Sequence, residues 1–244
     1  MKLFVTDYDG TLFIDEINLA INRKKLLELH KLGFIITIST GRSFKSIRKQ
    51  LEEHNLYYDY IHCADGSIIY DNKDNLINFF EIEHSIVNEI LKLKEKAIIE
   101  DIQISYPLEY KNIYNKNDKI AGINLVIKSE LIDKNFVLEF MNLKEKYPNY
   151  NFLFYDHGDY AYLCVKKEYV NKACAIKFMQ DLLQISKDNI YVIGDSFNDL
   201  EMIMEYNGVS IIGNSDVNKK SKKVYHQVYE YVNDIKEDLS IKIK

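Results

Sequence analysis

Three apolar runs of the chain each end in a cluster of polar side chains. Short apolar, β-branched runs bounded by turn residues predict buried strands, and the stretch 44–51 has the amphipathic spacing of a helix. Strands that alternate with helices are typical of a parallel sheet, whose ligands bind outside the carboxyl ends of the strands. We therefore expect an α/β protein with one shared site at one sheet edge. The runs with their polar ends are 3–6 with Asp7-Tyr8-Asp9-Gly10-Thr11-Leu12, 33–39 with Thr40-Gly41-Arg42-Ser43, and 189–193 with Gly194-Asp195-Ser196-Phe197-Asn198-Asp199-Leu200.

Asp7 and Asp9 stand two residues apart at the end of the first run. Side chains at positions i and i+2 of an extended backbone leave the same face, so both carboxylates can reach one small volume. A cation or a shared proton would relieve their repulsion, which points to a metal site or to acid/base chemistry. A plain acidic turn is the alternative, because Asp and Gly are common turn residues.

The end of the second run, at Thr40 and Gly41, also has two interpretations. Both residues stand just before a predicted helix. The free N–H groups and the positive dipole end of a helix amino terminus hold anions well. The alternative is ordinary capping of the helix by Ser43.

The third polar end gives the stronger functional signal. Asp195, Asn198 and Asp199 follow a buried strand, and their oxygen atoms suit the ligand shell of a hard cation. Upstream, Lys172 stands at the start of a predicted helix, against the helix dipole. An anionic neighbour would explain this position, and a solvated surface lysine is the alternative.

The first part of the chain also carries local signals for helix ends and a hairpin. Asn22 is predicted to be a helix N-cap, and Gly33 stands where a helix C′ residue belongs. The runs 67–70 and 76–80 flank Asp71-Asn72-Lys73-Asp74-Asn75. Such a polar turn between two strand-like runs predicts a β-hairpin.

From about residue 83 the pattern changes to helix, strand, strand, repeated twice. The predicted elements are helix 85–97, strands 102–106 and 120–127, helix 134–147, and strands 151–155 and 160–165. This order (αββαββ) predicts an inserted α+β domain at 83–165 with a four-stranded sheet and both helices on one face. Residues 1–82 and 166–244 would then form one discontinuous core.

Four segments in order resemble the motifs of the haloacid dehalogenase (HAD) superfamily. They are Asp7-Tyr8-Asp9-Gly10-Thr11-Leu12, Ser39-Thr40-Gly41-Arg42, Lys172, and Gly194-Asp195-Ser196-Phe197-Asn198-Asp199. The resemblance extends from residue 1 to about 220 and is nearest to Cof-type phosphatases of subclass IIB. It implies a Rossmann-like parallel-sheet core with a C2-type cap domain inserted between the second and third motifs.

The resemblance also implies a function and a role for each motif residue. The function is that of a Mg²⁺-dependent phosphatase, which hydrolyses small phosphorylated metabolites such as sugar phosphates through an aspartyl-phosphate. The acid at position 9 favours a phosphatase over a dehalogenase. The resemblance implies that Asp7 is the nucleophile and Asp9 the general acid and base. Mg²⁺ would be bound by Asp7, the Asp9 backbone carbonyl and Asp195, with Asp199 as a further ligand or behind these ligands. Thr40, Gly41 and Lys172 would hold the phosphoryl group, and Asn198 would orient Lys172 or the substrate.

One residue departs from the family pattern, and two other functions stay open. Asp65 stands in Cys63-Ala64-Asp65-Gly66-Ser67, where the family commonly reads Asn-Gly. It either joins the surroundings of the metal or weakens phosphate binding. The alternative functions are a phosphohexomutase-like phosphotransferase and a non-catalytic phosphometabolite-binding module. Candidates for substrate contact in the cap are Asn124, Tyr155, His157, Tyr160 and Tyr162.

Composition narrows the class of protein. The formal net charge is −5 over 244 residues, which gives no electrostatic footprint for nucleic acid. No segment approaches 18 uninterrupted apolar residues, so we expect no membrane span. Cys63, Cys164 and Cys174 lack the spacing of a metal site and suit a reduced, cytoplasmic protein. We expect a small phosphorylated metabolite as ligand and a monomer or homodimer.

Overall fold

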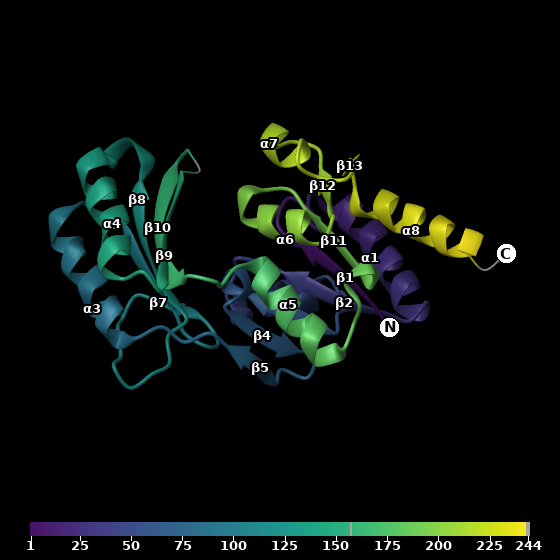
Figure 1. Ribbon diagram of the computed structural model, residues 1–244, viewed down its shortest axis with the longest axis horizontal. Coiled ribbons are helices and arrows are strands. Elements are labelled where there is room, and N and C mark those ends of the chain that lie inside the picture. The colour runs from purple at the N-terminus through teal and green to yellow at the C-terminus, as the bar shows by residue number, and fades with distance from the viewer. Residues whose placement is uncertain (157, 243–244) are drawn as a thin grey trace. The chain divides into compact units, whose positions relative to one another are not determined.

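The computed structural model describes residues 1–156 and 158–242, which form two units (Figure 1). The first unit comprises Met1–Arg42, Ile47–Ile77 and the chain from Asn171 onward, and the second comprises Ser43–Ser46 and Asn78–Val170. His157, one of the candidates for substrate contact, lies outside the described residues.

An eight-stranded sheet forms the centre of the first unit, in the order β13-β12-β11-β1-β2-β3-β4-β5. The pairs from β13 to β3 are parallel, and β4 runs antiparallel to β3. The α/β class with a parallel sheet is thus confirmed, and the sheet ends in the predicted hairpin, β4 and β5. The strands are β1 Lys2–Asp7, β2 Phe34–Ser39, β3 Tyr60–Cys63, β4 Ile68–Asp71, β5 Leu76–Phe79, β11 Ile190–Gly194, β12 Val209–Ile211 and β13 Val224–Tyr225.

Helices pack against both faces of this sheet (Figure 1). Leu3, Val5 and Val192 project from one face and pack with the apolar side chains of α5 and α6. Phe4 projects from the other face, where its ring lies 6.0 Å from that of Tyr231 on α8. Alternate residues of buried strands therefore serve two helical layers. The helices are α1 Glu16–Lys31, α2 Phe44–Glu53, α5 Lys172–Leu183, α6 Leu200–Glu205, α7 Ser215–Asn218 and α8 Val228–Lys242.

The predicted start of α1 is wrong, because Asn22 lies inside that helix. The N-cap is Asp15, whose side chain accepts a hydrogen bond from Asn18 N. Asn22 is fully buried; its Nδ2 donates to Leu12 O at 3.0 Å, and its Oδ1 accepts from Tyr229 N, also at 3.0 Å. Asn22 thus satisfies a free N–H at the start of α8, a different helix. The predicted C′ residue Gly33 is confirmed, with φ +82°.

The second unit contains a five-stranded antiparallel sheet in the order β7-β6-β8-β10-β9. The sequence predicts four strands; the fifth is β7, whose two residues are too few to show alternation. Both helices contribute to one apolar core with one face of this sheet. The elements are α3 His84–Leu93, β6 Asp101–Ser105, β7 Tyr110–Lys111, β8 Gly122–Lys128, α4 Lys134–Lys146, β9 Tyr150–Asp156 and β10 Tyr160–Lys167. Throughout the described residues, every helix is too short or too polar to cross a bilayer.

Candidate active site

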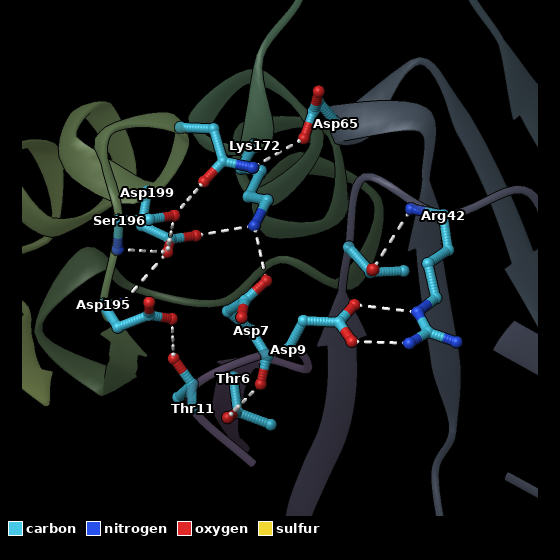
Figure 2. A network of polar contacts seen from close by, with 12 residues as sticks. Thr6, Asp7, Asp9, Thr11, Arg42, Asp65, Lys172, Asp195, Ser196 and Asp199 are labelled. Atoms are coloured by element: carbon cyan, nitrogen blue, oxygen red, sulfur yellow. Dashed lines mark hydrogen bonds and ion pairs between the residues drawn. The ribbon is translucent and has the colours of Figure 1, made fainter. Parts of the chain in front are cut away.

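The carboxyl ends of β1, β2 and β11 bring the predicted motif residues to one sheet edge. Asp7 is the last residue of β1, Thr40 follows β2 directly, and Asp195 follows β11 directly. Strand register fixes their alignment, because Asp7 pairs with Ser39 and Thr6 with Ile193. Figure 2 shows Asp7 between the loop of Asp195 and Asp199 on one side and Asp9 with Arg42 on the other.

Lys172 binds two carboxylates in the buried half of the site. Its side chain is 0% exposed, and Nζ donates to Asp7 Oδ1 and to Asp199 Oδ1, each at 2.6 Å. Asn171 caps α5 by accepting from Cys174 N, which places Lys172 at the first helical position. Burial disfavours the ammonium charge, yet Asp199 and Asp7 raise the pKa of Lys172 above its ordinary value. The anionic neighbours explain a lysine at this helix start.

Asp7, Asp195 and Asp199 form the cluster that could hold a cation. One oxygen of each lies within 4.8 Å of the others. Burial raises the pKa of Asp7 well above its ordinary value, against the opposing charge of Lys172, and burial also raises the pKa of Asp195. Three crowded carboxylates with one ammonium leave negative charge that a divalent ion would offset. The oxygen donors are those that Mg²⁺ prefers, so the residues fit the predicted metal.

Asp199 is oriented by the loop that carries it. Its Oδ2 accepts from Asp195 N at 3.0 Å and from Ser196 N at 3.1 Å, while its Oδ1 faces Lys172. A Cβ on Gly194 would lie 2.5 Å from the Asp199 Cβ, so only glycine fits there. Thr11 Oγ1 donates to Asp195 Oδ1 at 2.6 Å. The loop and Thr11 therefore hold both carboxylates of the fourth motif, Asp195 and Asp199.

Asp9 belongs to a separate, exposed half of the site. Its two oxygens accept from Arg42 Nε at 2.8 Å and from Arg42 Nη2 at 2.6 Å. The two side chains are 48% and 33% exposed. Arg42 also lies over the Tyr8 ring, 5.4 Å from its centroid. The Asp9 carboxylate thus faces Arg42. This role of Arg42 is not predictable from the sequence, because a partner 33 residues away leaves no local signal.

Backbone hydrogen bonds fix the turn that contains Thr40 and Gly41. Thr40 N donates to His62 O at 2.8 Å, and Thr40 O accepts from Asp65 N at 3.0 Å. Arg42 N donates to Thr40 Oγ1 at 3.2 Å, and Arg42 O accepts from Ala64 N at 3.0 Å. The loop after β3 therefore clamps the turn after β2.

That clamping loop, the 3-10 turn Ala64–Gly66, has three successive residues in the left-handed region. Their φ angles are 48°, 51° and 91°. Left-handed geometry costs roughly 1–2 kcal/mol for a residue with a Cβ, and Asp tolerates it better than most residues. A Cβ on Gly66 would lie 2.3 Å from Asn171 O, so the loop packs tightly against the start of α5. The strain persists because both neighbouring segments hold the loop in place.

Asn198 and Asp65 contact each other. Asn198 Nδ2 donates to Asp65 Oδ1 at 3.0 Å, and Asn198 Oδ1 accepts from Ser196 Oγ at 2.5 Å. Neither bond involves Lys172, and the other predicted role of Asn198, orienting the substrate, stays a prediction. Asn198 links the loop after β11 to the loop after β3.

His62 is a buried neighbour that the sequence analysis overlooked. It is 0% exposed, and both ring nitrogens lack a hydrogen-bond partner among the described residues. Strand register aligns it with Ser39, which in turn pairs with Asp7. Burial, with a contribution from the Lys172 charge, lowers the pKa of His62 to about 3. The imidazole beside the charged cluster is therefore neutral.

Known proteins resemble this chain in sequence over most of its length. A family model for haloacid dehalogenase-like hydrolases matches residues 4–165 and 109–235. The 5-amino-6-(5-phospho-D-ribitylamino)uracil phosphatase of Bacillus subtilis is 25% identical, over 91% of this chain and 88% of that protein. An uncharacterised protein of Mycoplasma capricolum is 27% identical, over 94% of this chain and 98% of that protein.

Solved structures share the fold at lower identity. A haloacid dehalogenase-like hydrolase from B. subtilis superimposes with a TM-score of 0.78 at 16% identity, covering 96% of this chain and 99% of that one. A sugar phosphatase of HAD subclass IIB gives 0.72 at 17% identity, with the same coverage.

The family that the four motifs predict is confirmed, and the predicted enzyme class, a phosphatase-type hydrolase, is confirmed with it. The motif residues lie together at one edge of a parallel sheet, as in the predicted fold class. The chain belongs to the haloacid dehalogenase-like hydrolases.

Proposed function

We propose that the protein is a Mg²⁺-dependent phosphatase that hydrolyses small phosphorylated metabolites through an aspartyl-phosphate on Asp7. The observation that carries the proposal is the buried set of Asp7, Lys172 and Asp199 beside Asp195. A nucleophilic carboxylate, a fixed cation and further metal-binding acids are the groups that phosphoryl transfer by this route requires.

In the first step, an Asp7 oxygen attacks the phosphorus and forms a new P–O bond. The bond to the leaving oxygen breaks, and that oxygen takes the proton from the Asp9 carboxyl. In the second step, Asp9 removes a proton from a water molecule, which attacks the phosphorus and releases phosphate and Asp7. Proton transfer of this kind contributes typically ~10²–10⁴-fold to the rate.

Arg42 has a place in the same steps. Its bidentate contact occupies both oxygens of Asp9, so Asp9 must leave the guanidinium before it can carry a proton to the substrate. A phosphate or the leaving oxygen is a suitable alternative partner for Arg42, because guanidinium binds phosphate oxygens well.

The remaining motif residues bind the substrate and the metal. Thr40, the amide of Gly41 and Lys172 hold the phosphoryl oxygens, and Asn198 fixes the loop beside them. Charge stabilisation by such groups is usually the largest catalytic contribution. Mg²⁺, held by Asp7, the backbone carbonyl of Asp9 and Asp195 with Asp199 adjacent, would supply neutralisation of the phosphate charge.

The relatives support a choice of substrates to assay first. One acts on a phosphorylated ribitylaminouracil and a solved structure is a sugar phosphatase, so sugar and sugar-alcohol phosphates are the first metabolites to assay. We also propose that residues 83–165 form the cap domain and that 1–82 and 166–244 form the catalytic core.

An aryl phosphate assay with and without Mg²⁺ tests the proposal. Wild type should hydrolyse the ester only with the metal, and Asp7→Asn should be inactive at equal folded concentration. Equal hydrolysis by both proteins would eliminate covalent catalysis by Asp7.

A further inference from the structure

Asp65 places an additional carboxylate beside the groups assigned to phosphate binding. Its Oδ1 accepts from Asn198 Nδ2 at 3.0 Å, and a Cβ on Gly41 would lie 3.2 Å from the same oxygen. The pKa of Lys172 is raised above its ordinary value, because the charges of Asp199, Asp7 and Asp65 outweigh the opposing effect of burial, so the Asp65 charge acts on the Lys172 ammonium. Figure 2 shows its position near Lys172.

The backbone holds this carboxylate in place. Asp65 has φ 51° inside the clamping loop, and its N–H donates to Thr40 O at 3.0 Å. Because Gly66 packs against Asn171 O and leaves no room for a Cβ, the loop cannot easily shift away. An incoming anion therefore meets the Asp65 charge as a fixed feature of the site.

The charge balance makes this addition consequential. Lys172 binds Asp7 and Asp199 directly, Asp195 lies with them in the carboxylate cluster, and Asp65 adds a further negative group that acts on the same lysine. Removing the charge of Asp65 strengthens any anion bound nearby and weakens any cation bound nearby, because the Coulomb energy changes sign with the ligand charge.

We propose that Asp65 determines the balance of affinities in this site, lowering its affinity for phosphate while raising its affinity for the divalent cation. This inference rests on the proposed function and adds Asp65 to the residues that set the affinities of the phosphate and metal sites. The sequence leaves two roles open for Asp65, one near the metal and one that weakens phosphate binding, and a single electrostatic effect accounts for both. In a phosphatase, weaker phosphate binding favours release of the product.

Asp65→Asn tests the proposal cleanly. Asn tolerates the left-handed backbone conformation, and the amide oxygen at this position can still accept the hydrogen bond from Asn198. Calorimetric titrations measure MgCl₂ binding to metal-free protein and inorganic phosphate binding at saturating Mg²⁺. We expect the phosphate Kd to fall about tenfold and the Mg²⁺ Kd to rise at least about threefold.

A matched control is Asp188→Asn, which removes the same charge from an exposed residue before β11, at the opposite end of that strand from Asp195. It should change neither Kd by more than about twofold. The opposite shifts are the signature of charge, because structural damage would weaken both ligands. If phosphate affinity does not rise, or Mg²⁺ affinity does not fall, the inference is overturned. Asp7-dependent hydrolysis with unshifted affinities would overturn this inference alone, leaving the proposed phosphatase intact.

Discussion

The buried and the exposed halves of the candidate site contain the same kind of ion pair in different surroundings. Lys172 meets Asp7 and Asp199 at 2.6 Å with side chains that are 0–7% exposed. Arg42 meets Asp9 at 2.6 Å, with side chains that are 33% and 48% exposed. The N–O distances are equal, so distance does not distinguish the two pairs, whereas their exposure to solvent does.

The contrast separates a rigid half of the site from an exchangeable half. A buried pair cannot lose one partner without leaving an uncompensated charge, so Lys172 and its carboxylates stay together. An exposed pair exchanges with water at little cost, so Asp9 can leave Arg42 to handle protons. The proposed nucleophile thus lies in the rigid half of the site and the proposed acid in the exchangeable half.

Removal of Lys172 should have the largest effect. In Lys172→Met, Asp7 and Asp199 are left buried without their cation, and we expect a loss of roughly 3–5 kcal/mol in the free energy of unfolding, together with loss of turnover. Urea denaturation without Mg²⁺ measures the stability.

Lys177→Met on the same helix provides the control. Lys177 forms an exposed pair with Asp181, so its loss should change the free energy of unfolding by about 0.5 kcal/mol at most. Similar losses in the two variants would show that burial does not separate the pairs.

Asp9→Asn should affect turnover far more than stability. Without the acid at position 9, kcat for an aryl phosphate should fall ~10²–10⁴-fold. The free energy of unfolding should change by about 1 kcal/mol or less, because the lost pair is exposed. Steady-state kinetics and urea denaturation on one preparation give both numbers. A large stability loss with retained turnover would reverse the assignment of the two halves.

Burial of His62 should make the free energy of unfolding depend on pH. The pKa of His62 is lowered from 6.5 to about 3 in the folded protein, so between pH 6.5 and pH 3 the unfolded state binds a proton that the folded state does not. The contribution of neutral His62 to the free energy of unfolding is complete above pH 6.5 and is lost as the pH falls toward 3. The loss amounts to about 3 kcal/mol by pH 4. His62→Leu should lose that much less stability between pH 7 and pH 4 than wild type.

Unfolding curves at each pH measure this difference, with His226→Leu as the control at an exposed histidine. The control should follow the wild-type pH profile. Identical profiles for wild type and His62→Leu would mean that His62 is not held neutral.

The smallest effect should come from coupling across the exposed pair. In a double-mutant cycle of Asp9→Asn and Arg42→Gln, we expect a coupling of about 1 kcal/mol or less in the free energy of unfolding. A coupling of several kcal/mol would place this pair with the buried one and remove its freedom to exchange.

The sequence predicts local features of the structure better than it predicts contacts between residues far apart in the chain. Apolar runs and their polar ends predict the sheet edge that carries Asp7, Thr40 and Asp195, because strand ends are local features. The side-chain partners are not local. Lys172 meets Asp7 across 165 positions and Asn22 meets Tyr229 across 207, so the role of Lys172 stayed open and the prediction for Asn22 was wrong.

The burial of individual polar side chains was also not predictable from the sequence. His62 is one polar residue in an apolar strand, and its burial in the folded protein, together with the Lys172 charge, keeps it neutral. Arg42 is the last residue of the second motif, yet its pairing with Asp9 depends on the contact between the loop after β1 and the loop after β2. Motif spacing therefore predicts which groups gather, and tertiary packing decides their charge and their partners.

The covalent intermediate on Asp7 is the most direct test of the proposed mechanism. Acid quenching of Asp9→Asn during turnover of an aryl phosphate with Mg²⁺, followed by mass spectrometry of the peptides, should show a phosphoryl group on the peptide that contains Asp7. An aryl oxygen leaves readily without a proton, so loss of Asp9 should slow the second step more than the first, and the adduct should accumulate. Phosphate release by wild type, with no adduct at any quench time in either protein, would contradict the account.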